Sequence, residues 1–294
     1  MDNKRRFPLV LSSFWLKIIA LLTMTIDHVG YLLPQSTLSY VFRCIGRLAL
    51  PLFCFMIAEG AIHTKSFKKY ALRLGIMASA ISIGIIGSEY IPYFKNNGFS
   101  MRDQGIIFVD LLLGAIAIYC LRQKKWYLKL LAILPVAFSV VSFIASTIES
   151  CRCYGEILWF PFFIRTQYGW YATAMIVGFY IAYLVSKLFI KYHSGITGIE
   201  QEFYKGSNFE RHVVNIFSAF VLILMTFAYY ACYTLLPAKF QLYDFTIQLY
   251  AMVAGAFILL YSGARGYNKK WFQYGSYLYY PIHMIILYLI FSLI

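Results

Sequence analysis

Nine long runs of apolar residues, separated by short polar connections, organise this chain. A helix needs about 20 mostly apolar residues to cross a bilayer, so each run predicts one membrane span. A tenth stretch, 157–164, is too short to cross and contains Pro161, which is typical of a re-entrant or interfacial segment. The pattern predicts an all-α polytopic integral membrane helical bundle with about 9 to 10 transmembrane helices, with spans near 14–33, 44–63, 70–89, 105–121, 127–147, 168–187, 213–235, 245–263 and 276–293.

Composition leads to the same class. Of the 294 residues, 61% are hydrophobic and 13% are charged, and the mean hydropathy is +0.67. A soluble domain is about a quarter charged, so this balance excludes an ordinary globular enzyme and a disordered chain. We expect a single membrane domain over 1–294 that begins with a basic cytoplasmic leader at 1–13. This leader runs directly into a full-length apolar segment without a small-residue cleavage site, which indicates a permanent first span.

The net charge of +14 is large for such an apolar chain, and its distribution predicts an orientation. Basic residues concentrate in the cytoplasmic connections of membrane proteins. A topology signal also accounts for the charge without nucleic acid binding, which we do not expect. The N-terminus is therefore predicted to be cytoplasmic and the C-terminus external, in a bacterial-type inner membrane. On the predicted inner side lie 19 of the 26 basic residues: Lys4, Arg5, Arg6, Lys17, Lys65, Lys68, Lys69, Arg73, Arg122, Lys124, Lys125, Lys129, Lys187, Lys191, Lys205, Arg211, Arg265, Lys269 and Lys270.

The six cysteines are mostly interpreted as small apolar core residues. Cys151 and Cys153 are the exception, because they fall in a predicted outer connection where a disulfide is chemically sensible. Cys232, near the outer end of its span, is a possible partner. Two thiolates without a nearby histidine or further cysteine are weak evidence for a metal site, so no metal is predicted.

A small set of ionisable residues lies inside the spans, where charge is costly and indicates function. The set comprises Asp27 and His28, Arg43 and Arg47 one helical turn apart, Glu59 and His63 four residues apart, Asp110, and His283.

Blocks around these residues resemble the TraX family of membrane proteins, named for the acetylase that modifies the N-terminus of F-type conjugative pilin. The resemblance covers essentially the whole chain. It rests on LKIIALLTMTIDHVGYLLP (16–34), FRCIGRLALPLFCFMIAEGAIHT (42–64), YGWYA (168–172), LLYSGARG (259–266) and YLYYPIHMIILYLI (277–290).

The resemblance implies a membrane acetyltransferase. The family is similar to a wider group of multi-span acyltransferases, which includes the lysosomal heparan glucosaminide N-acetyltransferase and bacterial polysaccharide O-acyltransferases. It implies transfer of an acetyl group from cytoplasmic acetyl-CoA to an acceptor reached at or across the membrane. That acceptor is a peptide amine, an amino sugar or a sugar hydroxyl. Carried residue by residue, the implied site comprises Asp27, His28, Arg43, Arg47, Glu59, His63 and His283.

The chemistry of acyl transfer assigns roles to the buried residues. A base must take a proton from the incoming nucleophile, and His28 is the best candidate because a neutral imidazole accepts protons near pH 7. Asp27 is a poor orienting partner, since neighbours on a helix point about 100° apart. We therefore expect a carboxylate from another span, with Asp110 as the candidate, to orient His28.

Arg43 and Arg47 are expected mainly to pair with Asp27 and to position it. Binding of an acceptor carboxylate and donation to an oxyanion remain open alternatives. His283 is placed with Glu59 and His63 in a second, cytoplasmic cluster. The positive loops around Lys68, Lys69, Lys124 and Lys125 are candidates for attracting the phosphates of CoA, although they would attract the anionic headgroups of membrane lipids equally.

Each of these signals also has a purely structural interpretation. The Asp27–His28 pair can stabilise helix contacts, the arginines can anchor headgroups, and Glu59 with His63 can form a terminal pair. Two other functional classes also stay open, a multi-span transporter and an envelope-machine scaffold without catalysis. A transporter is expected to show internal repeats, and the sequence shows no clear repeat.

Overall fold

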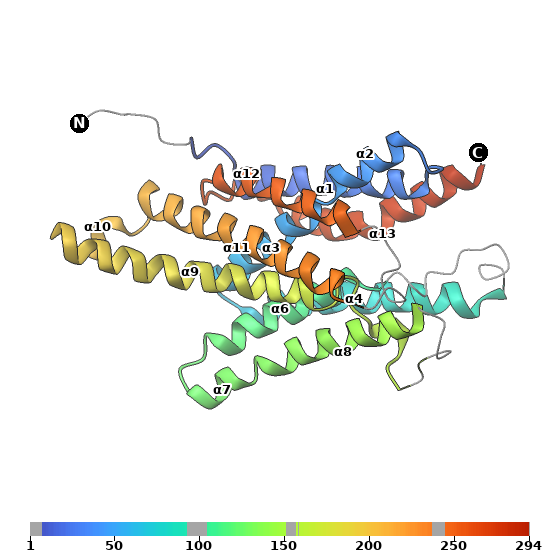
Figure 1. Ribbon diagram of the computed structural model, residues 1–294, viewed down its shortest axis with the longest axis horizontal. Coiled ribbons are helices and arrows are strands. Elements are labelled where there is room, and N and C mark those ends of the chain that lie inside the picture. Colours follow the sequence, from blue (N-terminus) through green and yellow to red (C-terminus); the bar gives the residue numbers. More distant parts are fainter. Residues whose placement is uncertain (1–7, 93–104, 151–156, 158, 237–244, 294) are drawn as a thin grey trace. The chain divides into compact units, whose positions relative to one another are not determined.

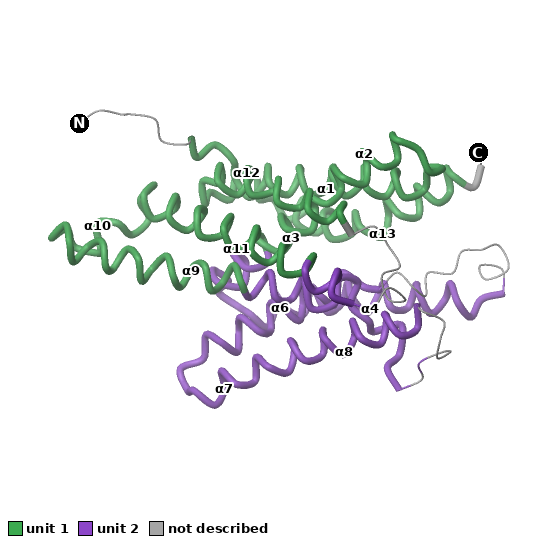
Figure 2. Tube along the Cα trace, viewed as in Figure 1, with its two compact units in different colours: residues 1–56, 178–230, 245–294 green, residues 57–177, 231–244 purple. Residues whose placement is uncertain are grey.

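The computed structural model describes residues 8–92, 105–150, 157, 159–236 and 245–293. The chain divides into two compact units. Unit 1 contains Met1–Met56, Gly178–Tyr230 and Phe245–Ile294, and unit 2 contains Ile57–Val177 and Ala231–Asp244 (Figure 2).

The described chain is helical, as expected for a structure whose backbone must satisfy its hydrogen bonds within lipid. Its β structure is confined, in these residues, to an isolated bridge between Leu11 and Tyr261. The helices, labelled in Figure 1 where there is room, are α1 (Ser13–Leu32), α2 (Thr37–Gly46), α3 (Ala49–His63), α4 (Phe67–Tyr90), α6 (Ile107–Leu121), α7 (Trp126–Leu130), α8 (Ile133–Ser150), α9 (Trp170–Thr197), α10 (Gln201–Tyr204), α11 (Asn208–Thr234), α12 (Ala254–Leu259) and α13 (Lys270–Leu293), with 3₁₀ turns η2 (Phe162–Ile164) and η4 (Phe245–Val253).

The all-α membrane bundle predicted from the sequence is confirmed. Within the described part of the chain, seven helical segments are long and apolar enough to cross a membrane: Ser13–Leu32, Thr37–His63, Phe67–Tyr90, Trp126–Ser150, Trp170–Thr197, Asn208–Thr234 and Lys270–Phe291. The other two predicted spans correspond to shorter apolar helices at Ile107–Leu121 and Thr246–Leu259, whose crossing stays a prediction. The predicted short segment at 157–164 contains only the single turn η2 as regular structure in its described part.

The second predicted span is interrupted where α2 ends and α3 begins. Pro51 lies in the first turn of α3 and has no N–H to donate to the carbonyl of Arg47, four residues earlier. The amides of Arg47 and Leu48 instead bond three residues back, to Cys44 and Ile45. This tighter turn leaves Arg47 at the end of α2, beside α1.

Helices α1 and α2 of unit 1 pack together over two glycines. A Cβ added to Gly30 would lie 2.7 Å from the Cβ of Phe42, and one added to Gly46 would overlap the Cβ and carboxylate of Asp27. The Ser39 hydroxyl also donates to the Gly30 carbonyl at 2.6 Å. Small residues at such crossings let membrane helices approach closely.

Gly46→Ala should lower the free energy of unfolding by about 1–3 kcal/mol, because the new methyl group forces α2 away from Asp27. Unfolding of the purified protein in detergent measures this loss. Gly275→Ala in α13 is the matched control, since nothing lies within 4 Å of its added Cβ. Equal stability of the two variants would contradict the close packing at Gly46.

In unit 2, α6 lies beside α4, α7 and α8, and η2 lies against α4. The segment before α9 is joined to this group by hydrogen bonds from the amide of Ile106 to the Arg165 carbonyl and from the amide of Thr166 to the Ser142 hydroxyl.

Candidate functional site

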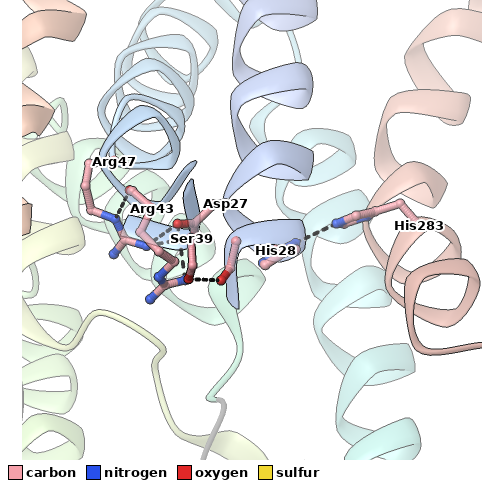
Figure 3. A network of polar contacts seen from close by, with 7 residues as sticks. Asp27, His28, Ser39, Arg43, Arg47 and His283 are labelled. Carbon is pink, nitrogen blue, oxygen red and sulfur yellow. Dashed lines mark hydrogen bonds and ion pairs between the residues drawn. The ribbon is translucent and has the colours of Figure 1, made fainter. Parts of the chain in front are cut away.

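The candidate site lies in unit 1, on the C-terminal half of α1, where Asp27 and His28 point to different sides of the helix. Asp27 faces Arg43 of α2 and Arg47, which caps the C-terminal end of α2, and His28 faces His283 of α13 (Figure 3). The divergence follows from the roughly 100° rotation between successive helical residues. Two polar groups adjacent in sequence therefore enter two different contacts.

The carboxylate of Asp27 is held by two guanidinium groups. Nη2 of Arg47 donates to Oδ1 and Oδ2 of Asp27 at 2.5 and 2.7 Å, and Nη1 of Arg43 lies 3.1 Å from Oδ1. Nε of Arg47 donates to the backbone carbonyl of Arg43, which fixes the plane of its guanidinium group. The ion pair expected from the sequence is therefore present, and Asp27 is buried.

The three charged groups together carry a net charge of +1 in an apolar bundle. Arg43 is the more accessible arginine: its side chain is 29% exposed against 12% for Arg47, and its guanidinium group lies 5.3 Å from the ring centroid of Tyr31. An accessible cation that shares its carboxylate with a second cation is suited to receive an anionic group.

His28 forms a dyad with His283, in which Nδ1 of His28 and Nε2 of His283 are 2.7 Å apart. The rings are nearly parallel, with centroids 4.9 Å apart. Nδ1 of His283 lies 2.8 Å from the carbonyl oxygen of Tyr279, which can only accept a hydrogen bond.

That carbonyl sets the proton positions throughout the dyad. With Nδ1 of His283 as the donor, a neutral His283 leaves its Nε2 as an acceptor, so Nδ1 of His28 must donate to it. A neutral His28 then keeps the lone pair on Nε2. Among the residues that the structure describes, none is hydrogen-bonded to that nitrogen, and the ring is half-buried. The arrangement thus presents an oriented base.

His283 is where the structure corrects the grouping expected from the sequence. The sequence pattern groups it with Glu59 and His63, but its ring hydrogen-bonds His28 and so belongs to the α1 site. Glu59 and His63 form their own i, i+4 contact at the end of α3, where Nδ1 of His63 lies 3.9 Å from Oε2 of Glu59. The side chain of His63 is 55% exposed.

Asp110 does not take the orienting role expected of it. Its carboxylate is fully buried in unit 2 and accepts hydrogen bonds from the backbone amides of Gln167 and Tyr168 at 2.7 and 3.3 Å. The ring partner of His28 is instead a second imidazole. Asp110 ties the chain preceding α9 to α6, which is a structural role the pattern of apolar runs did not reveal.

The remaining predicted residues are placed more simply. Lys68 and Lys69 are exposed at the start of α4, and Lys124 and Lys125 are exposed in the connection between α6 and α7. Cys232 is exposed, whereas Cys151 and Cys153 lie outside the described residues, as does most of the basic leader. Within the described residues, no group of three potential metal ligands comes together.

Sequence reasoning overlooked several polar contacts. Arg165 is buried in unit 2, where it pairs with Glu149 and donates to the carbonyl of Phe160. In unit 1, Thr25 and Tyr279 join α1 to α13 through a 2.6 Å contact between their hydroxyl groups. Thr25 lies three residues before His28, and Tyr279 lies four residues before His283, so helical spacing was the available signal.

The fold and site together define a polytopic helical membrane protein with a charged and histidine-containing cluster inside its bundle. The family model described as TraX protein matches residues 12–196, more than half of the chain, and the chain belongs to this family.

Two curated relatives match parts of the chain. It is 33% identical over 115 residues to the "Probable fimbrial assembly protein FimC, serogroup H1" of Dichelobacter nodosus, covering 35% of this chain and 47% of that protein. It is 32% identical over 147 residues to an uncharacterized protein of Rickettsia prowazekii (strain Madrid E), covering 44% and 54% respectively. The matches span about half the length of these relatives. No solved structure matches.

Proposed function

We propose that this TraX-family protein is a membrane acetyltransferase that moves an acetyl group from acetyl-CoA to an amine or hydroxyl acceptor. The observation that carries the proposal is the His28–His283 dyad, because it presents an imidazole lone pair inside an apolar bundle. A histidine so arranged is suited to general-base catalysis of acyl transfer. Acetyl-CoA is proposed as the acetyl donor because the family is named for a pilin acetylase.

The proposed reaction balances without a further reactant. The acceptor nitrogen attacks the thioester carbonyl carbon while Nε2 of His28 takes its proton, so a C–N bond forms. The C–S bond then breaks, and the CoA thiolate leaves with the proton that His28 returns. Proton transfer by a positioned histidine contributes about 10²–10⁴-fold to such rates.

Arg43 is assigned to the anionic part of the reactants. The thioester oxygen becomes an oxyanion during attack, and CoA carries phosphates, so a partly exposed guanidinium group is an appropriate donor in either case. Arg47 and Asp27 hold Arg43 in place through their shared ion pairs. The exposed lysines Lys68 and Lys69 are proposed to attract CoA from solution or anionic lipid headgroups at the membrane surface.

A peptide amine is the favoured acceptor class. One relative bears a fimbrial assembly name, and fimbriae are built from protein subunits with N-terminal amines. We also propose that the protein lies in a bacterial inner membrane with its N-terminus in the cytoplasm. The distribution of basic residues supports this orientation.

The test is transfer of labelled acetyl from acetyl-CoA by the full chain in proteoliposomes. Three acceptors are offered in parallel: a peptide with a free N-terminus, glucosamine and glucose. Acetylation of any of them supports the proposal and identifies the acceptor class. Absence of transfer and hydrolysis, together with absence of acetyl-CoA binding, would overturn it in favour of a transporter or scaffold.

Arg43→Gln should raise the KM for acetyl-CoA by about tenfold, because a charge-assisted hydrogen bond is replaced by a neutral one. Steady-state kinetics at varied acetyl-CoA measure the change. Arg73→Gln on α4 is the control, since its Nε bonds only one turn back within its own helix, to the carbonyl of Lys69. Equal KM values for the two variants would remove Arg43 from the binding role.

A further inference from the structure

A continuous chain of polar contacts links the backbone of α1 to the histidine dyad. The hydroxyl of Thr25 donates to the carbonyl of Leu21 at 2.9 Å. Thr25 has a single hydroxyl hydrogen, so in its 2.6 Å contact with Tyr279 the tyrosine hydroxyl is the donor. The hydroxyl group of the Tyr279 ring is therefore tethered to α1 through Thr25.

The same tyrosine contacts His283 in two further ways. Its backbone carbonyl accepts from Nδ1 of His283 at 2.8 Å, and its ring lies parallel to the imidazole, with centroids 5.0 Å apart and an interplanar angle of 9°. The ring of His28 also lies nearly parallel to that of His283, with centroids 4.9 Å apart and an interplanar angle of 20°. Tyr279, His283 and His28 thus form one ladder of nearly parallel rings.

We propose that Tyr279, anchored by Thr25, is the positioning residue of the dyad and takes the place that a carboxylate occupies in other histidine-dependent sites. This inference rests on the function proposed above. In a Ser-His-Asp triad, the carboxylate fixes the tautomer of the histidine and stabilises its cation. Here a backbone carbonyl fixes the tautomer of His283, which in turn fixes that of His28.

The ring ladder also provides for the positive charge that forms on the dyad. When Nε2 of His28 takes a proton, the proton on its Nδ1 can shift toward Nε2 of His283 along the 2.7 Å contact. The cation is then shared with a ring that lies over the face of Tyr279, and cations over an aromatic face are stabilised. Other charged groups near His28 are Asp27, Arg43 and Arg47, and they lie toward a different side of α1 (Figure 3).

Removal of a hydroxyl group at either end of the tether tests the positioning role. Tyr279→Phe and Thr25→Val should each lower kcat on the order of tenfold, with KM for acetyl-CoA within about twofold of wild type. Thr25→Ser keeps the acceptor oxygen and should restore most of the loss. Tyr274→Phe, which removes an exposed hydroxyl from the same helix, is the matched control.

Nitrogen NMR of ¹⁵N-histidine-labelled protein reports the tautomers without reference to activity. The dyad predicts that both His28 and His283 carry their proton on Nδ1 when neutral. Tyr279→Phe and Thr25→Val should mix the tautomers of His28, whereas His283 keeps its proton on Nδ1 because its partner is a backbone carbonyl of its own helix. Predominant Nε2 protonation in the wild type, or wild-type kcat in both variants, would overturn the proposal. Predicted tautomers in a protein that transfers no acetyl group would instead refute the proposed function and leave the tether standing.

Discussion

His28→Ala should lower the rate of acetyl transfer by about 10²–10⁴-fold, the contribution expected of a positioned general base. The variant loses the only nitrogen of the dyad that has a lone pair directed away from His283. It should insert and fold, because the imidazole is half-buried and alanine favours helix. Turnover of labelled acetyl-CoA in proteoliposomes, normalised to folded protein, measures the loss.

His212→Ala is the control for this prediction, since His212 near the start of α11 has no proposed role. It should transfer acetyl at the wild-type rate. Equal rates for His28→Ala and the wild type would remove the assigned base, and equal losses in both histidine variants would point to a general effect on the fold.

The dyad is compatible both with direct transfer of the acetyl group and with an acetyl-histidine intermediate. The same lone pair on Nε2 of His28 can remove a proton or attack the thioester. Exchange of labelled CoA into acetyl-CoA without an acceptor separates the routes, because only the covalent route permits it.

Asp27→Ala should reduce the free energy of unfolding by about 3–5 kcal/mol, the usual cost of removing one partner from a buried ion pair. Two guanidinium groups would lose the carboxylate that they share, while Arg47 remains largely enclosed, with 12% of its side chain exposed. Acetyl transfer should fall as well, since Arg43 loses its position. Unfolding of the detergent-solubilised protein, followed by loss of helix signal, measures the destabilisation.

The double variant Asp27→Ala/Arg47→Met separates lost charge pairing from lost packing. Removing the second charge together with the first should recover part of the stability, and the double-mutant cycle gives the coupling energy. A single variant within about 0.5 kcal/mol of wild type would show that the ion pair contributes little.

The sequence correctly predicted most of the helical architecture, because the cost of exposing polar backbone to lipid forces apolar runs into helices. It did not predict the division of the second span. The signal was present at Pro51, but a proline can also be accommodated within a membrane helix, and α13 does accommodate Pro281. The 3₁₀ turn at Phe245–Val253 was likewise invisible to an apolar pattern.

The partners within the site were harder to predict than its members. The contact of Asp27 with Arg43 and Arg47 was expected from complementary charge. His283 was assigned to the wrong group for two reasons. The predicted span starts at 276 whereas α13 starts at Lys270, which moves His283 past the middle of the helix, and position along a span says nothing about lateral neighbours. Asp110 was assigned to His28 because the sequence does not reveal that the backbone amides of Gln167 and Tyr168 donate hydrogen bonds to its carboxylate.

By itself, the sequence determined the class of protein, its helical spans and the short set of buried ionisable residues, because charge in hydrocarbon is too costly to occur without a reason. The tertiary structure decided which of these residues meet. Gly30 and Gly46 bring α2 against α1, so Asp27 reaches both arginines, and the Thr25–Tyr279 contact joins α13 to α1, so His283 reaches His28. Such pairings depend on lateral packing between helices far apart in sequence, which no periodicity along one helix encodes.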